Sequence, residues 1–315
     1  MKFGVREICD VVFKAKSAGS IGKYSYGIGQ PVLYIDSAKT STMEGAATTV
    51  YATGGKGNNR LVAWEGEKTL TFTVEDALLS PISFSILAGA GLFEPDSNNK
   101  AHVHTTARVG MSVDGEGNVT IDLTDALGQN EGIDKDAPVF VMVEEADGSL
   151  TGDFVRELSV EVEDVPKKLL GKGILNSTNA APATGTSTVF VDFYVEKAAG
   201  VQEIVIDEGT FGGYFYVEAS TLFRRQIDGK DLPAELVFPN VKIQSNFSFS
   251  MSSTGDPSTF TFTMDAFPGY TMFDKTKKVL CAMQVVDEAV ASGNTIIKDS
   301  ITPNTANPGH VEGIE

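Results

Sequence analysis

Two stretches of the chain alternate threonine with large apolar residues. They are Thr69–Asp76 (Thr-Leu-Thr-Phe-Thr-Val-Glu-Asp) and Thr259–Asp265 (Thr-Phe-Thr-Phe-Thr-Met-Asp). Because successive side chains of a β-strand point to opposite faces, a period of two predicts half-buried strands. Phe247–Met251 repeats the pattern with serine. We therefore expect a sheet with one buried apolar face and one hydroxyl-lined face, the latter carrying Thr69, Thr71, Thr73, Ser248, Ser250, Thr259, Thr261 and Thr263.

Similar apolar runs between turn residues predict most of the remaining chain as short strands. Residues 1–31 lack a sustained period and suggest an arm, residues 36–47 suggest a long loop, and the segments Gly54–Asn59 and Glu65–Glu67 suggest turns. The further predicted strands are Val32–Ile35, Thr48–Ala52, Leu61–Trp64, Val103–Met111, Val119–Leu123, Val139–Val143, Leu158–Val162, Val189–Val195, Glu203–Ile206, Tyr214–Val217, Val241–Met251 and Val279–Val286.

The clearest helix signal follows Ser80. This serine can cap a helix, Pro81 suits its first position, and Gly89 suits its end. The chain as a whole is thus predicted to be mainly β with one short flanking helix. We expect a discontinuous core of residues 1–98 and 176–291, an inserted β subdomain at 99–175, and an extended or disordered tail at 292–315.

The composition of the chain argues against several classes of function. The 315 residues include 25 Lys and Arg against 42 Asp and Glu, a net charge of −17, which disfavours binding to a phosphate backbone. The start shows no signal-peptide pattern, and no apolar run reaches the roughly 20 residues that cross a bilayer. We expect synthesis in the cytoplasm, no membrane segment, and reduced thiols at Cys9 and Cys281.

Motifs for catalysis or ligand binding are weak. Gly54–Gly57 lacks the Walker spacing, and Asp114, Glu116 and Asn118 are followed by Val119 where a calcium loop needs glycine. His102 and His104 would share a strand face, but no Cys or third His lies nearby to complete a metal site. We therefore predict no catalytic residue, no cofactor and no metal, and the protein is not expected to be an enzyme.

Several segments together resemble the tail tube proteins of tailed bacteriophages. Asn58–Gly91 reads as strand, turn, strand and capped helix, and the likeness returns in the second half of the chain, at Leu232–Ile243, Phe247–Met251, Gly255–Asp265 and Val279–Val286. The resemblance implies a β-sandwich or rolled barrel with a flanking helix. It also implies hexameric rings that stack into a hollow tube for the genome, in a virion tail that is contractile or non-contractile.

The resemblance gives roles to particular residues. The hydroxyl-lined face becomes the candidate lumen wall, and the acidic charge would let DNA slide past without specific binding. The long loop, with Thr40, Thr42, Glu44, Lys56 and Asn58, becomes the candidate contact between rings. The implied partners are other copies of the chain and a tail sheath or other tail proteins. The alternative is an immunoglobulin-like adhesion or binding module on a virion or cell surface, since short strands with frequent turns also describe that fold.

Overall fold

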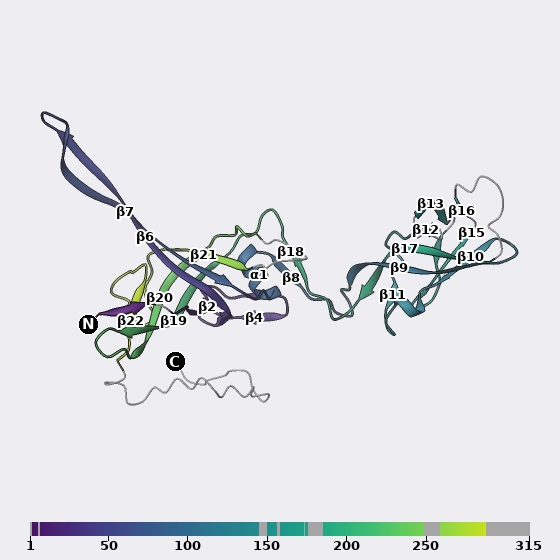
Figure 1. Ribbon diagram of the computed structural model, residues 1–315. Helices are drawn as coiled ribbons and strands as arrows, with labels where there is room; N and C mark the ends of the chain where they lie inside the picture. The colour runs from purple at the N-terminus through teal and green to yellow at the C-terminus, as the bar shows by residue number, and fades with distance from the viewer. Residues whose placement is uncertain are drawn as a thin grey trace. The chain divides into compact units, whose positions relative to one another are not determined.

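A computed structural model describes residues 2–5, 7–144, 150–155, 158–172, 174–175, 185–248 and 259–287. The protein is mainly β, as predicted, with one α-helix in the described part of the chain (Figure 1). The chain forms two compact units. The first contains Met1–Ser17, Gly27–Leu79 and Gly213–Glu315, and the second contains Ala18–Tyr26 and Ser80–Gly212. Within the described residues, no helix is long and apolar enough to cross a membrane.

The first unit is built on a nearly closed, barrel-like antiparallel sheet. Its strand order is β5-β2-β19-β20-β21-β7-β6, with β1 paired to β19 and β22 paired to β20. The strands are β1 (Phe3–Val5), β2 (Asp10–Ala15), β5 (Pro31–Ile35), β6 (Ala38–Gly54), β7 (Asn59–Asp76), β19 (Tyr214–Arg225), β20 (Asp231–Ile243), β21 (Phe260–Ala266) and β22 (Ala282–Val285).

Alternating apolar side chains of this sheet form the core of the first unit. Phe72 of β7 stacks on Phe238 of β20, with ring centroids 4.8 Å apart, and both side chains are almost fully buried. In the same core, the ring centroids of Phe13 and Phe262 lie 6.1 Å apart. Aromatic pairs at these distances add a favourable ring interaction to the burial of their apolar area. The alternation predicted from the sequence therefore identifies the buried face of β7 and β21.

The N-terminal region is part of the sheet, contrary to the predicted arm. β2 lies between β5 and β19, and Val11 and Phe13 have no exposed surface. The period of two in this strand spans only six residues and is soon followed by Ser17 and Gly19, so it is a weak local signal. Burial between two long strands decides its structure. Cys9 is buried nearby, and both cysteines are free, as expected.

The predicted strand Val241–Met251 is only partly correct. β20 begins ten residues earlier than predicted, at Asp231, and ends at Ile243. Its two prolines disfavour a strand locally. In the structure, Pro239 lies where the register between β19 and β20 shifts, a position at which a missing N–H costs no ladder hydrogen bond. The predicted tail at 292–315 lies outside the described residues.

The largest difference from the sequence prediction is a single long hairpin. Residues 36–47 were expected to be a loop and Glu65–Glu67 a turn, yet β6 and β7 are continuous strands of 17 and 18 residues that pair along their whole length. The register shifts between Ala47 and Thr49, opposite Gly66. A β-carbon on Gly66 would collide with the Thr48 hydroxyl, which would have to rotate away, so glycine eases this close approach. The segment 36–47 has too few large apolar residues to be predicted as a strand from its sequence. Hydrogen bonding to β7 is what makes it one.

The second unit contains the predicted helix. In α1 (Pro81–Ala88), the Ser80 hydroxyl accepts from the Ser83 backbone N–H at 3.0 Å, and Gly89 ends the helix with a left-handed φ of 68°. Two small sheets accompany it, formed by β3 (Gly19–Ile21) with β4 (Tyr24–Tyr26) and by β8 (Gly91–Phe93) with β18 (Glu203–Val205). Capping therefore fixes the position of the helix as the sequence predicts.

A separate antiparallel sheet forms the rest of the second unit, with the order β14-β15-β10-β9-β17-β12-β13-β16 and β11 paired to β17. The range 99–175 contributes β9 to β16, and β17 joins the same sheet from beyond that range. Its elements are β9 (Ala101–Val113), β10 (Asn118–Asp122), the 3-10 turn η1 (Thr124–Ala126), β11 (Gly132–Ile133), β12 (Phe140–Glu144), β13 (Leu150–Val155), β14 (Ser159–Val160), β15 (Lys168–Lys172), β16 (Ile174–Leu175) and β17 (Gly185–Lys197).

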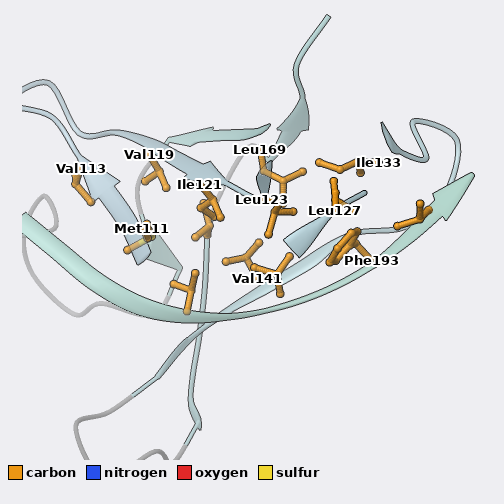
Figure 2. Packing of buried hydrophobic residues seen from close by; sticks show 14 residues of the cluster. Met111, Val113, Val119, Ile121, Leu123, Leu127, Ile133, Val141, Leu169 and Phe193 are labelled. Carbon is orange, nitrogen blue, oxygen red and sulfur yellow. The ribbon is translucent and has the colours of Figure 1, made fainter. Parts of the chain in front are cut away.

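This second sheet curves around its own hydrophobic core. Figure 2 shows Met111, Ile121, Leu169 and Phe193 among the side chains that point into the space between the strands. Each of these side chains is at most 1% exposed. The second unit therefore has a complete core of its own, as an independently folding domain requires.

Candidate functional site

Three neighbouring strands of the first unit share a polar face. On β7, Thr71, Thr73 and Glu75 alternate with the buried Phe72 and Val74. Strand pairing places β21 residues beside them on one side and β6 residues on the other. The cross-strand rows are Thr40–Glu75–Thr261, Thr42–Thr73–Thr263 and Glu44–Thr71–Asp265.

Hydrogen bonds along this polar face connect hydroxyls with carboxylates. Thr71 Oγ1 donates to Asp265 Oδ1 at 3.2 Å, and Thr40 Oγ1 donates to Glu75 Oε2 at 3.1 Å. Thr259 also donates its hydroxyl to Glu75. The Thr259 and Thr40 hydroxyls lower the pKa of Glu75 from its ordinary value. The face is therefore both hydroxyl-rich and anionic at neutral pH.

The structure gathers most of the hydroxyl residues that the sequence predicts for this face. Thr69, Thr71, Thr73, Thr261 and Thr263 lie on β7 or β21 with the predicted alternation. Thr259 directly precedes β21. Ser248 is exposed and lies after the end of β20, so it does not extend a strand of the face, and Ser250 lies outside the described residues.

The residues predicted for a contact loop fall into two groups. Thr40, Thr42 and Glu44 lie on β6 and belong to the polar face, which corrects their assignment to a loop. Lys56 and Asn58 lie in the turn between β6 and β7, where the prediction placed a turn, and Asn58 adopts a positive φ of 49°. Sequence reasoning also missed Glu75 and Asp265, because it followed only the threonines.

Beyond the register shift, the far half of the hairpin carries an exposed apolar surface. We call residues 48–67 the hairpin tip, and it extends past the other strands of the first unit (Figure 1). Val50 pairs with Trp64 and Ala52 with Val62, so these four side chains share one face. Val50 is 63% exposed, Val62 50% and Trp64 56%. Exposed apolar residues gathered on one face in this way are typical of a protein interaction surface.

The opposite face of the hairpin tip is different. There the Arg60 guanidinium lies 4.0 Å from the centre of the Tyr51 ring, and Thr49 pairs with Glu65. Since the two faces differ in polarity, the tip presents one apolar side, which we call the apolar stripe (Val50, Ala52, Val62 and Trp64).

A free strand edge accompanies these surfaces. Within the described residues, β6 ends the strand order of its sheet and pairs with β7 alone. Long unprotected edges expose unpaired N–H and C=O groups and readily accept a strand from another chain. The edge of β6 therefore offers a second surface for association.

The other sequence motifs have structural explanations. The Asp114 carboxylate accepts from the backbone N–H groups of Glu116 and Asn118, each at 2.8 Å, so it stabilises a tight turn. Gly55 and Gly57 have positive φ in the hairpin turn, as predicted for a turn rather than a phosphate-binding loop. His102 and His104 pair separately with Asp134 and Asp192.

Comparison with known proteins agrees with this architecture. No curated protein matches the chain. The model of one family, described as the YomU/Tube protein family, matches residues 4–280, which includes both the long hairpin and the second sheet. The chain therefore belongs to the YomU/Tube protein family, and this membership indicates a structural tube protein of a phage virion.

Proposed function

We propose that this protein is the repeating subunit of a phage tail tube, and that it self-assembles into hexameric rings which stack into a hollow conduit for the genome. The observation that carries the proposal is the β6–β7 hairpin, which combines a free edge, a polar face and an apolar tip in one element. Each of these features matches a different requirement of a tube.

Ring closure is assigned to the free edge of β6. A neighbouring subunit that adds a strand there would satisfy the unpaired backbone groups and continue the sheet around the ring. Closure of this kind removes the exposed edge altogether, which explains why a long unprotected edge is tolerated in the single chain.

The lumen is assigned to the polar face of β6, β7 and β21. Its carboxylates, Glu44, Glu75 and Asp265, would repel the phosphates of passing DNA, and its threonine hydroxyls would keep the wall wetted. DNA would then move through without specific binding. The net charge of −17 acts in the same direction.

Contact between rings is assigned to the hairpin tip. The apolar stripe is exposed in the single chain and would be covered by the adjacent ring. Burial of apolar area is worth about 25 cal/mol per Å², so several exposed side chains per subunit, repeated around a ring, would supply a substantial stacking energy.

Electron microscopy of negatively stained, tag-free protein at increasing concentration tests the proposal. Hollow rods or six-fold rings are expected. Trp64→Ser should prevent stacking while leaving the subunit folded, and Ala63→Ser, on the opposite face of the same strand, is the matched control and should assemble as the native chain does. Dispersed monomers at every concentration, also after addition of preformed tail tips, would contradict the proposal and favour an adhesion module.

A further inference from the structure

Three side chains of metal-binding type converge in the second unit. They are His102 on β9, Asp134 directly after β11, and Glu196 on β17, and one ligand atom from each lies within 4.8 Å of the others. Strand pairing enforces this arrangement, because His102 lies directly opposite Glu196. The Asp134 backbone N–H donates to the Tyr194 carbonyl at 2.9 Å, which holds the aspartate beside the same strand.

Asp134 is the unusual member of the group. Its side chain is only 2% exposed, although its oxygens accept just two hydrogen bonds from the part of the chain that the structure describes. Oδ1 accepts from the Asp136 backbone N–H at 2.9 Å, and Oδ2 lies 2.6 Å from His102 Nδ1. A buried carboxylate is costly unless it is paired, so His102 is its main stabilising partner in this structure.

Glu196 and His102 open toward solvent. The His102 side chain is 59% exposed. Glu196 binds Lys100 Nζ through Oε2 at 2.5 Å, which leaves its second oxygen for another ligand. Both residues line an open hollow together with Phe93, Asn98, Asn99 and Lys100. An ion can therefore reach His102 and Glu196 from outside, and Asp134 lies behind them.

We propose that His102, Asp134 and Glu196 bind a divalent transition-metal ion of the zinc type. One imidazole nitrogen and two carboxylate oxygens are ligands that zinc accepts, and water would complete a four-coordinate site. In the absence of the ion, the imidazole and the Asp136 backbone N–H compensate the buried carboxylate. When bound, the ion would join β9, β17 and the segment after β11 at the end of the β9–β17 ladder, and would stabilise the second unit.

His104 provides a matched control in the same strand. It lies two residues after His102 on the same exposed face and also pairs with a carboxylate, Asp192, at 2.8 Å. Within the described residues, however, no third ligand joins that pair. If binding depends on the three-residue geometry, replacing His102 should therefore weaken it and replacing His104 should not.

Isothermal titration of the tag-free, full-length chain with zinc chloride tests the proposal. One zinc ion per chain is expected. His102→Ala and Glu196→Gln should each weaken binding by about tenfold or more, whereas His104→Ala should bind as the native chain does. Glu196→Gln and His104→Ala change partly exposed side chains and should fold as the native chain does by circular dichroism. His102→Ala also removes the partner of the buried Asp134 carboxylate and should lower the melting temperature without zinc, so Glu196→Gln is the cleaner test of binding.

Two further measurements sharpen the result. Zinc should raise the melting temperature of the native chain and of His104→Ala, but not of His102→Ala, because an ion that binds only the folded state stabilises it. Calcium should produce no such shift, since it favours oxygen over imidazole. The proposal would be overturned if the native chain did not bind zinc, if both histidine variants lost the same affinity for zinc, or if His102→Ala bound zinc as tightly as the native chain.

Discussion

At the scale of single residues, Phe72 connects the core of the first unit with its polar face. Its ring is 1% exposed and stacks on Phe238, while its neighbours Thr71 and Thr73 point to the opposite side of β7. The position of one buried ring therefore helps to orient the candidate lumen wall.

Replacing Phe72 with alanine should lower the free energy of unfolding of the first unit by about 3–5 kcal/mol, because it removes a stacked ring and leaves a cavity. Urea unfolding followed by circular dichroism measures the change. The control is Thr69→Ala, an exposed position on the same strand, which should change stability by less than about 0.5 kcal/mol. Equal effects at the two positions would contradict the assigned core.

The lowered pKa of Glu75 predicts that the folding stability of the first unit depends on pH. Hydrogen bonds from Thr259 and Thr40 lower its pKa in the folded state, so the ionised carboxylate favours folding. This contribution is present above the unfolded pKa of about 4.3 and is lost as pH falls through the lower folded value. Glu75→Gln should therefore reduce the loss of stability on acidification from about pH 5 to about pH 3. Urea unfolding at several pH values provides the comparison, and parallel curves would show that the carboxylate is not linked to folding.

At the scale of elements, the β6–β7 hairpin shows where sequence reasoning works and where it does not. Thr69–Asp76 was predicted as a strand because its apolar residues recur with a strict period of two. Ala38–Ala47 was not, because its residues are small or polar and give no such period. Its structure is determined by hydrogen bonding to β7, which is a pairing between segments about 30 residues apart.

The hairpin tip can be removed without disturbing the sheet. Ala47 pairs with Lys68, so an Asn-Gly turn in place of residues 48–67 should close the shortened hairpin in register. We expect this variant to remain folded but not to stack into tubes, because the tip contributes exposed rather than buried side chains. Analytical ultracentrifugation and electron microscopy measure its assembly. Normal tubes from the shortened chain would rule out the role assigned to the tip.

At the scale of the whole molecule, net charge should govern association. A chain with a net charge of −17 repels its own copies, and salt screens that repulsion. Raising sodium chloride from about 50 mM to about 500 mM, which shortens the Debye length to a few ångströms, should lower the concentration at which assembly begins. Light scattering over a concentration series measures this threshold. A threshold that rises with salt would indicate that attraction between charged groups, and not apolar burial, drives assembly.

The sequence by itself determined the β class, the capped helix at Pro81–Ala88 and the two-faced strands around Phe72 and Phe262. These features depend on periodicity and on capping, which are local properties. The tertiary structure alone decided that β2 and the first part of β6, up to Ala47, are strands, that Thr40, Thr42 and Glu44 join Glu75 and Asp265 on one face, and that Asp134 and Glu196 meet His102. Each of these depends on pairing between distant segments, which supplies the hydrogen bonds and burial that no local pattern encodes.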